Sequence, residues 1–153
     1  MTRPAPAFAG GFTLIELVVV LLVLGLALGL VAPSVSHVSD SIRARAEVAG
    51  LSAFLRHARE EAILRRERCE VRLDPATQVL TLTTGDQQAV KASRAIRPPT
   101  RIASITPGAG TIAFLPEGHS TGGGFVLEAP GGRVYSVTVD PVSGRVSNYL
   151  LAS

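Results

Sequence analysis

The chain has 153 residues and a formal net charge of +3, carried almost entirely by arginine because Lys91 is the only lysine. This mild excess does not by itself indicate a nucleic-acid-binding protein. The single cysteine, Cys69, excludes an intrachain disulfide and a site built from several cysteines, so we expect it to be a small buried apolar side chain. The residues after Ala32 suffice for one compact domain with its own core.

The first element in chain order is an apolar run from Phe12 to Ala32, 21 residues with one charge, Glu16, and no proline. As a helix rising ~1.5 Å per residue it would be about 31 Å long, close to a hydrocarbon core of roughly 30 Å. Fifteen of these residues are Phe, Leu, Ile or Val. Their insertion contributes roughly −4.5 to −9 kcal/mol, against about +3 kcal/mol for one carboxylate. The sequence predicts a transmembrane helix over 12–32, which is too long and too charged for a cleaved secretory signal.

Glu16 requires a partner, because an ionisable side chain in a membrane span is costly unless it is neutralised. One interpretation is that the carboxylate lies near the helix end and reaches the lipid headgroups. The other is that the chain is cut between Gly11 and Phe12. The new α-amino group of Phe12 would then be cationic and would lie on the same helix face as Glu16, four residues further on.

These residues carry a family resemblance. The stretch from Gly11 to Leu17, followed by the long Val/Leu run, resembles the class III leader and helix start of type IV pilins and type II secretion pseudopilins. The resemblance implies that a prepilin peptidase removes residues 1–11 by cutting after Gly11 and methylates the new N-terminus at Phe12. It further implies that Glu16 neutralises the N-terminal amine of a neighbouring subunit during filament assembly.

Three more residues belong to this predicted helix. Gly25 and Gly29 form a small-xxx-small face that permits close approach of another helix in lipid, and Pro33 resembles the proline that pilin-like helices carry at the membrane exit. Apolar residues at spacings of three and four then predict that the helix continues over 33–67 with one face on a domain. That stripe comprises Val35, Val38, Ile42, Val48, Leu51, Leu55, Ala58 and Ala62. Two pairs of opposite charge at i,i+4 support it, Arg56–Glu60 and Glu61–Arg65.

From residue 68 the hydrophobic period changes to two, which predicts a β-rich globular domain over 68–153. Seven strands are expected, at 70–73, 79–83, 101–105, 111–115, 125–128, 134–139 and 145–149. The first two and the fifth and sixth should form hairpins through proline-containing turns. The stretch between the second and third strands should be less regular, with Pro98-Pro99 as a breaker. The predicted fold class is α+β, with one long N-terminal helix, its first half transmembrane, packed on a mostly antiparallel β-sheet domain. By the resemblance this fold is pilin-like.

Short motifs in the second half extend the resemblance. Ala58–Ile63, Phe114–Gly118 and Val139–Val146 are similar to segments of the H-type minor pseudopilins and the related FimT-type minor pilins. What this implies is a subunit at or near the tip of the periplasmic pseudopilus of the type II secretion system. The protein would be anchored once in the inner membrane, with its N-terminus cytoplasmic before cleavage. Its partners would be other major and minor pseudopilins, the prepilin peptidase, the membrane and secreted proteins, with no cofactor.

Two other function classes stay open. One is a FimT-type minor pilin for DNA uptake. The resemblance implies several basic residues near the C-terminal end for that role, whereas Arg145 is the last charged residue before the chain ends at Ser153. An anchored enzyme is the other, but the glycine-rich stretch 117–124 lacks the Lys-Ser/Thr ending of a phosphate loop. His119 beside Ser120 does not make a catalytic pair, and the three histidines lack metal-ligand spacing. We expect 117–124 to be a mobile surface loop.

Overall fold

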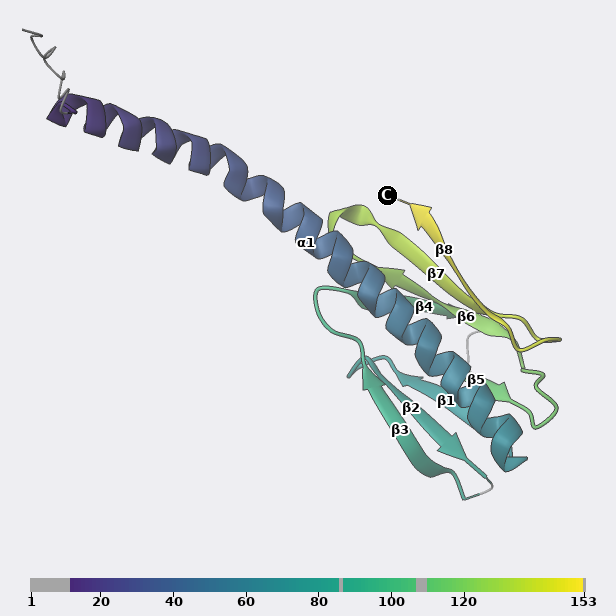
Figure 1. Cartoon of the computed structure of the whole chain (residues 1–153). Coiled ribbons are helices and arrows are strands. Elements are labelled where there is room, and N and C mark those ends of the chain that lie inside the picture. Colours follow the sequence, from purple (N-terminus) through teal and green to yellow (C-terminus); the bar gives the residue numbers. More distant parts are fainter. Residues whose placement is uncertain (1–11, 86, 107–109, 153) are drawn as a thin grey trace, which may run out of the picture. The chain divides into compact units, whose positions relative to one another are not determined.

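A computed structural model describes residues 12–85, 87–106 and 110–152. The chain forms two compact units, Met1–Val38 and Ser39–Ser153, and one helix, α1 (Leu14–Arg65), has residues in both of them (Figure 1). Pro33 lies within α1, and the helix ends close to the point predicted from its periodicity. Within the described residues, we find no helix with the length and apolar character needed to cross a membrane.

Local sequence accounts for both ends of α1. At the start, the hydroxyl oxygen of Thr13 accepts a hydrogen bond from the backbone N–H of Glu16 at 3.3 Å, and the Thr13 carbonyl accepts one from Leu17 at 3.2 Å. Thr13 is therefore the N-cap, in the Thr-x-x-Glu pattern common at helix starts. At the end, Arg66 takes a left-handed conformation with φ 55°, and the N–H of Glu67 donates to the Ala62 carbonyl at 3.3 Å. This is the hydrogen-bond pattern of a Schellman C-cap.

The inner face of α1 in the second unit agrees with most of the predicted stripe. Its buried side chains recur at spacings of three and four, and they are Ala44, Val48, Leu51, Leu55, Ala58 and Ala62. The prediction was wrong at Ile42, whose side chain is 63% exposed. Ile42 lies two residues before Ala44 and hence roughly 200° around the helix from the buried face. The side chains of Val35 and Val38 lie outside the described set.

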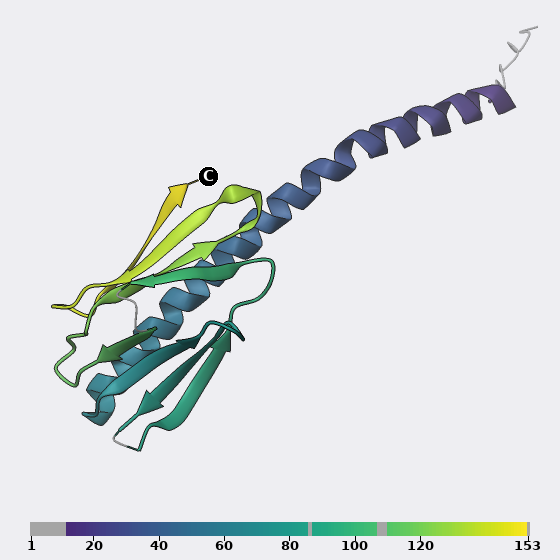
Figure 2. The same ribbon diagram turned by 180° about the vertical axis from the view of Figure 1, so that it is seen from behind.

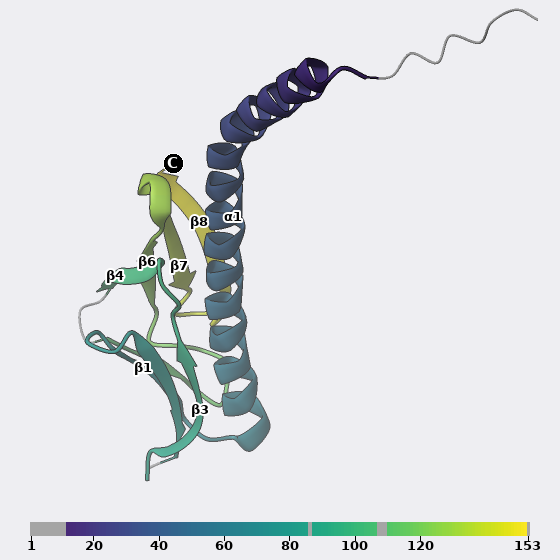
Figure 3. The same ribbon diagram turned by 90° about the vertical axis from the view of Figure 1, so that its left-hand side faces the viewer.

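The β-rich part consists of two four-stranded sheets in which all neighbouring strands are antiparallel (Figures 1 and 2). The first sheet has the order β3-β2-β1-β5, with β3 at Ala89–Ala95, β2 at Val79–Thr84, β1 at Cys69–Asp74 and β5 at Thr111–Phe114. The second has the order β4-β6-β7-β8, with β4 at Arg101–Thr106, β6 at Gly123–Glu128, β7 at Val134–Val139 and β8 at Val146–Ala152. Figure 3 shows the part of α1 that belongs to the second unit lying along one side of both sheets.

The two predicted hairpins are confirmed as β1–β2 and β6–β7, the second joined by a short 3₁₀ turn, η1 (Pro130–Gly132). The prediction of an irregular stretch before Pro98 was wrong, because β3 pairs with β2 there. β3 is an edge strand whose side chains are mostly exposed, so it lacks the alternation of apolar residues that marks a half-buried strand.

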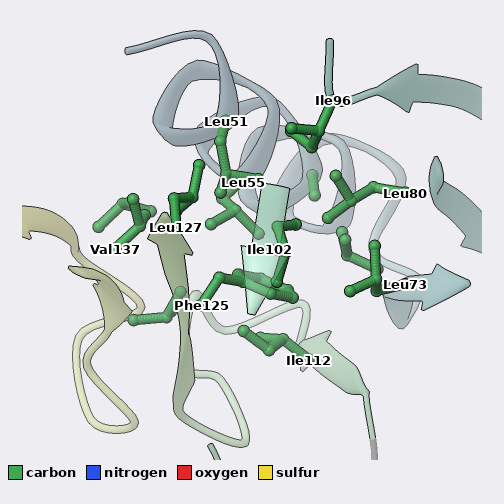
Figure 4. Packing of buried hydrophobic residues seen from close by; sticks show 14 of the residues in the cluster. Leu51, Leu55, Leu73, Leu80, Ile96, Ile102, Ile112, Phe125, Leu127 and Val137 are labelled. Carbon is green, nitrogen blue, oxygen red and sulfur yellow. The ribbon is translucent and has the colours of Figure 1, made fainter. Parts of the chain in front are cut away.

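Both sheets share one core with α1 (Figure 4). Leu51 and Leu55 of the helix lie between Leu80 of the first sheet and Leu127 of the second. A side-chain amide also links the sheets, since Gln78 accepts a hydrogen bond from the Ile102 N–H at 2.7 Å. The second unit is therefore a single packed body in which α1 covers both sheets.

Candidate assembly site

The start of α1 exposes an unusual amount of apolar surface. Every Leu, Ile and Val side chain from Leu14 to Leu28 is exposed, and the Phe12 side chain is 83% exposed. Leaving one such side chain in water instead of burying it costs about 1.5–3 kcal/mol. Because they lie on all sides of the helix, a single flat partner surface would not cover them. The exposed apolar side chains of this segment therefore occupy the whole circumference of the helix.

The predicted cleavage and assembly residues lie at this end of the chain. Gly11 is outside the described residues, while Phe12 directly precedes the Thr13 cap and Glu16 lies in the first helical turn. A carboxylate in the first turn is stabilised by the helix dipole. Thr13 thus uses the backbone N–H of Glu16, while the Glu16 carboxylate makes no hydrogen bond or ion pair with another described residue.

The predicted helix-packing residues are also within α1. A methyl group added at Gly25 would meet no atom within 4 Å, so the described residues do not occupy the space beside this glycine. Gly29 and Pro33 are helical positions as well.

In the second unit, the three short motifs of the sequence meet at one side chain, Arg59 of α1. The Arg59 guanidinium donates a hydrogen bond from Nε to the carbonyl oxygen of Gly118 at 3.2 Å. A methyl group on Gly144 would lie 2.8 Å from the same Nε and 3.1 Å from Arg59 Cδ. We call Arg59, Gly118 and Gly144 the arginine junction. The Arg59 side chain is half-buried in this arrangement.

The glycines of the arginine junction are required by its geometry. Gly118 and Gly144 have φ values of 89° and 63°, in the left-handed region that glycine adopts without steric cost. A methyl group on Gly144 would also clash with the Gly118 carbonyl oxygen. The signal in the sequence was a pair of glycine-containing turns together with an arginine next to a buried alanine of the helix, Ala58.

The stretch 117–124 is anchored to the fold, so the expectation of a mobile surface loop was wrong. Ser120 is only 7% exposed, and its N–H and hydroxyl donate to the carbonyls of Pro141 and Asp140, each at 3.0 Å. Thr121 and Ala113 exchange two further hydrogen bonds, at 2.9 and 3.0 Å. These bonds tie the stretch to β5 on one side and to the β7–β8 turn on the other.

The β7–β8 turn is ordered by one carboxylate. Asp140 Oδ1 accepts hydrogen bonds from the N–H groups of Val142 and Ser143, at 3.1 and 2.7 Å, and from the Ser143 hydroxyl at 2.8 Å. The bonds from Ser143 hold the pKa of Asp140 below its usual value. The Asp140 N–H also donates to the Arg145 carbonyl at 2.9 Å, which fixes the backbone of Arg145.

Cys69 and the acidic residues form no metal centre in the described ranges. Cys69 is fully buried, as expected for a lone cysteine, and burial raises the pKa of its thiol to about 11. Such a thiol is a poor nucleophile at neutral pH. Among residues 12–85, 87–106 and 110–152, no three His, Cys, Asp or Glu side chains are placed to hold a metal ion.

Of the two ion pairs predicted along α1, Glu61–Arg65 forms. The predicted Arg56–Glu60 pair is not among the ion pairs of the described residues.

Comparison with known proteins places this geometry in a family. The profile of the family described as Type II transport protein GspH matches residues 47–144, more than half of the chain and the whole arginine junction. The fold is similar to that of the minor pseudopilin EpsH from the type 2 secretion system of Vibrio cholerae, with a TM-score of 0.61 and 18% identity over 72% of this chain and 99% of that chain. It is also similar to the type IV minor pilin FimU of Pseudomonas aeruginosa, with a TM-score of 0.57 and 15% identity over 69% and 91% of the two chains. A search of curated proteins finds no match.

The two solved structures show the fold alone, because their identities to this chain are low. The family match rests on the sequence itself and extends from the second half of α1 to the turn before β8. The chain therefore belongs to the GspH family of type II transport proteins, the pilin-like H-type minor pseudopilins.

Proposed function

We propose that this chain is a minor pseudopilin of the type II protein secretion system, a structural subunit placed at or near the tip of the periplasmic pseudopilus. The family match over residues 47–144 carries this proposal. Members of this family are structural subunits and not enzymes, and the half-buried Arg59 and the fully buried Cys69 both serve packing. The chain acts by assembling with other major and minor pseudopilins, and the growing or retracting assembly contacts secreted proteins.

Residues 12–32 serve as the membrane anchor in this proposal. Their composition favours insertion by several kcal/mol even with one carboxylate present. The exposed Leu, Ile and Val side chains of the helix start support it, because lipid surrounds a helix on all sides. Gly25 and Gly29 would allow a neighbouring pilin helix to approach the anchor closely, and residues 33–67 would carry the helix from the inner membrane into the periplasm.

Prepilin peptidase cleavage would prepare the N-terminus for assembly. Removal of residues 1–11 after Gly11 frees the amino group of Phe12, which is then methylated on nitrogen and stays cationic. Glu16 is the one acidic residue of the anchor, and its carboxylate has no partner among the described residues. A neighbouring subunit's amine would therefore neutralise Glu16, and the low dielectric of the membrane would strengthen the attraction.

Substitution of Glu16 tests this mechanism. We expect Glu16→Ala to lower incorporation into the pseudopilus by about tenfold or more, since hydrogen bonds to charged groups contribute about 1.5–3 kcal/mol. Thr13→Ala is the matched control, because it removes the helix cap but keeps the carboxylate. Incorporation is measured by co-purification with the major pseudopilin, together with secretion in a strain that lacks its own H-type subunit. Wild-type incorporation and secretion with Glu16→Ala would contradict the paired-charge mechanism.

A second candidate is a minor pilin of a type IV pilus that takes part in DNA uptake. The likeness of this fold to the minor pilin FimU favours it. The charge distribution does not, because no residue after Arg145 is charged and DNA binding relies on several phosphate contacts. Binding of DNA that weakens steeply between 50 and 200 mM salt would support this candidate over the secretion role.

A further inference from the structure

We propose that a groove beside the arginine junction binds an acidic segment of another pseudopilus subunit. The groove has a volume of about 550 Å³ and lies between α1 and the turn that precedes β8. Its charged lining residues are Arg56, Arg59, Glu60 and Arg145, and we call it the basic groove. The inference rests on the proposed function, because it takes the partner to be a subunit of the same assembly.

The basic groove holds cations that the described residues do not neutralise. The ion pairs of the described residues are Arg65–Glu61, Arg68–Glu70, Arg94–Glu47 and Arg101–Glu128. None of them includes Arg56, Arg59 or Arg145. With three arginines and one glutamate, the lining has an excess of two positive charges, which attracts a carboxylate-bearing partner and disfavours a basic one.

The fold orders the side chain of Arg59 and the backbone of Arg145 before any ligand arrives. Arg59 uses one of its five N–H donors on the Gly118 carbonyl. Arg145 is positioned through its backbone, because its N–H donates to the Ser143 hydroxyl at 3.3 Å and its carbonyl accepts from Asp140 at 2.9 Å. In the same turn, the Asp140 carboxylate accepts its hydrogen bonds from Val142 and Ser143. A pre-ordered side chain such as that of Arg59 loses less conformational freedom on binding, which raises affinity.

The size and composition of the groove favour a short acidic peptide over a nucleic acid. The planar arginine guanidinium binds one carboxylate through two parallel hydrogen bonds, so three arginines suit two or three acidic side chains. Proteins that hold a single nucleic-acid strand combine a long positive track with aromatic side chains on which bases stack. The basic groove has no aromatic lining residue, and Glu60 lies among its arginines.

Peptide binding to the full chain in detergent micelles tests the inference. The probe is a fluorescently labelled hexaglutamate peptide, followed by fluorescence anisotropy at low salt. We expect the double variant Arg56→Gln/Arg145→Gln to bind the peptide about tenfold more weakly, because it removes two charge-assisted contacts. The matched control is Arg72→Gln/Arg97→Gln, which changes the net charge equally at two exposed arginines outside the groove. Arg59 is left intact because it packs within the fold.

Equal weakening in both double variants would overturn the inference, since only net charge would then matter. Tighter, groove-dependent binding of a 12-nucleotide single strand than of the peptide would also overturn it, in favour of a nucleic-acid site. Secretion separates this inference from the proposed function. If the wild-type chain restores secretion in a strain without its own H-type subunit but does not bind the peptide, only the groove is refuted. If the peptide binds in the groove but the chain restores no secretion, the assignment of the partner is refuted with the function.

Discussion

Substitution of Gly144 by alanine tests the arginine junction quantitatively. The new methyl group would contact the Gly118 carbonyl and would lie 2.8 Å from Arg59 Nε. A residue with a Cβ costs about 1–2 kcal/mol in the left-handed conformation, and overpacking of a close contact typically adds about 1–3 kcal/mol. We therefore expect Gly144→Ala to lower the free energy of unfolding by about 2–5 kcal/mol. For a domain of this size that corresponds to a fall in Tm of roughly 10 °C or more.

Gly131→Ala is the matched control. Gly131 also has a positive φ, 77°, but a methyl group there would meet no atom within 4 Å, so only the conformational cost of about 1–2 kcal/mol applies. Both variants are measured on the full chain in detergent micelles by thermal unfolding followed with circular dichroism. If Gly144→Ala is no more destabilising than Gly131→Ala, the close approach of helix, loop and turn at the arginine junction is refuted.

Two further predictions concern buried groups of the second unit. Because burial raises the pKa of Cys69 to about 11, the unfolded chain, with a thiol pKa near 8.5, loses this proton at a lower pH than the folded chain. Stability should therefore fall as the pH rises from about 8.5 to 11. Unfolding of Cys69→Ala should lack this contribution to the pH dependence, and a fall of the same size in this variant would contradict the assignment. A glycine-to-alanine change within a helix normally raises the free energy of unfolding by roughly 1 kcal/mol, but Gly50→Ala should not. Its methyl group would lie 2.8 Å from Arg94 Nη1 and would displace the guanidinium from Glu47. A rise in the unfolding midpoint that matches the full ~1 kcal/mol would refute this prediction.

Local patterns were enough to predict the elements that pack by a regular period. The buried face of α1 from Val48 to Ala62 follows from apolar residues at spacings of three and four. The β1–β2 hairpin follows from alternation of apolar residues on either side of a turn that contains Pro75. In both cases the residues that define the pattern are neighbours in sequence, so the element can be predicted without knowledge of the tertiary fold.

Features that depend on distant parts of the chain were not predictable in this way. β3 is held by pairing with β2 and by an ion pair of 3.0 Å between Arg94 and Glu47 of α1. Neither contact produces a periodic pattern in the sequence. The arginine junction joins residues 59, 118 and 144. The three motifs were recognised one by one through resemblance, but only the fold shows that one guanidinium brings them together. The division of the β-strands into two sheets likewise depends on long-range pairing.

The N-terminal residues illustrate a different limit. Composition alone predicts an apolar anchor with one acidic residue, and the structure adds the Thr13 cap and the exposure of the apolar side chains. The partner of Glu16 lies in another molecule under the proposed mechanism. The structure of a single chain therefore shows that the Glu16 carboxylate lacks a partner among the described residues, but the identity of that partner depends on the assembly.

Mass spectrometry of the mature N-terminus tests the central claim most directly. The protein is isolated from cells with and without prepilin peptidase, and its N-terminal peptide is sequenced. An assembly subunit of the pilin class should begin at N-methylated Phe12 only when the peptidase is present. A chain that keeps Met1 in both strains, or one that is cut beyond Ala32, would contradict the pseudopilin account of this protein.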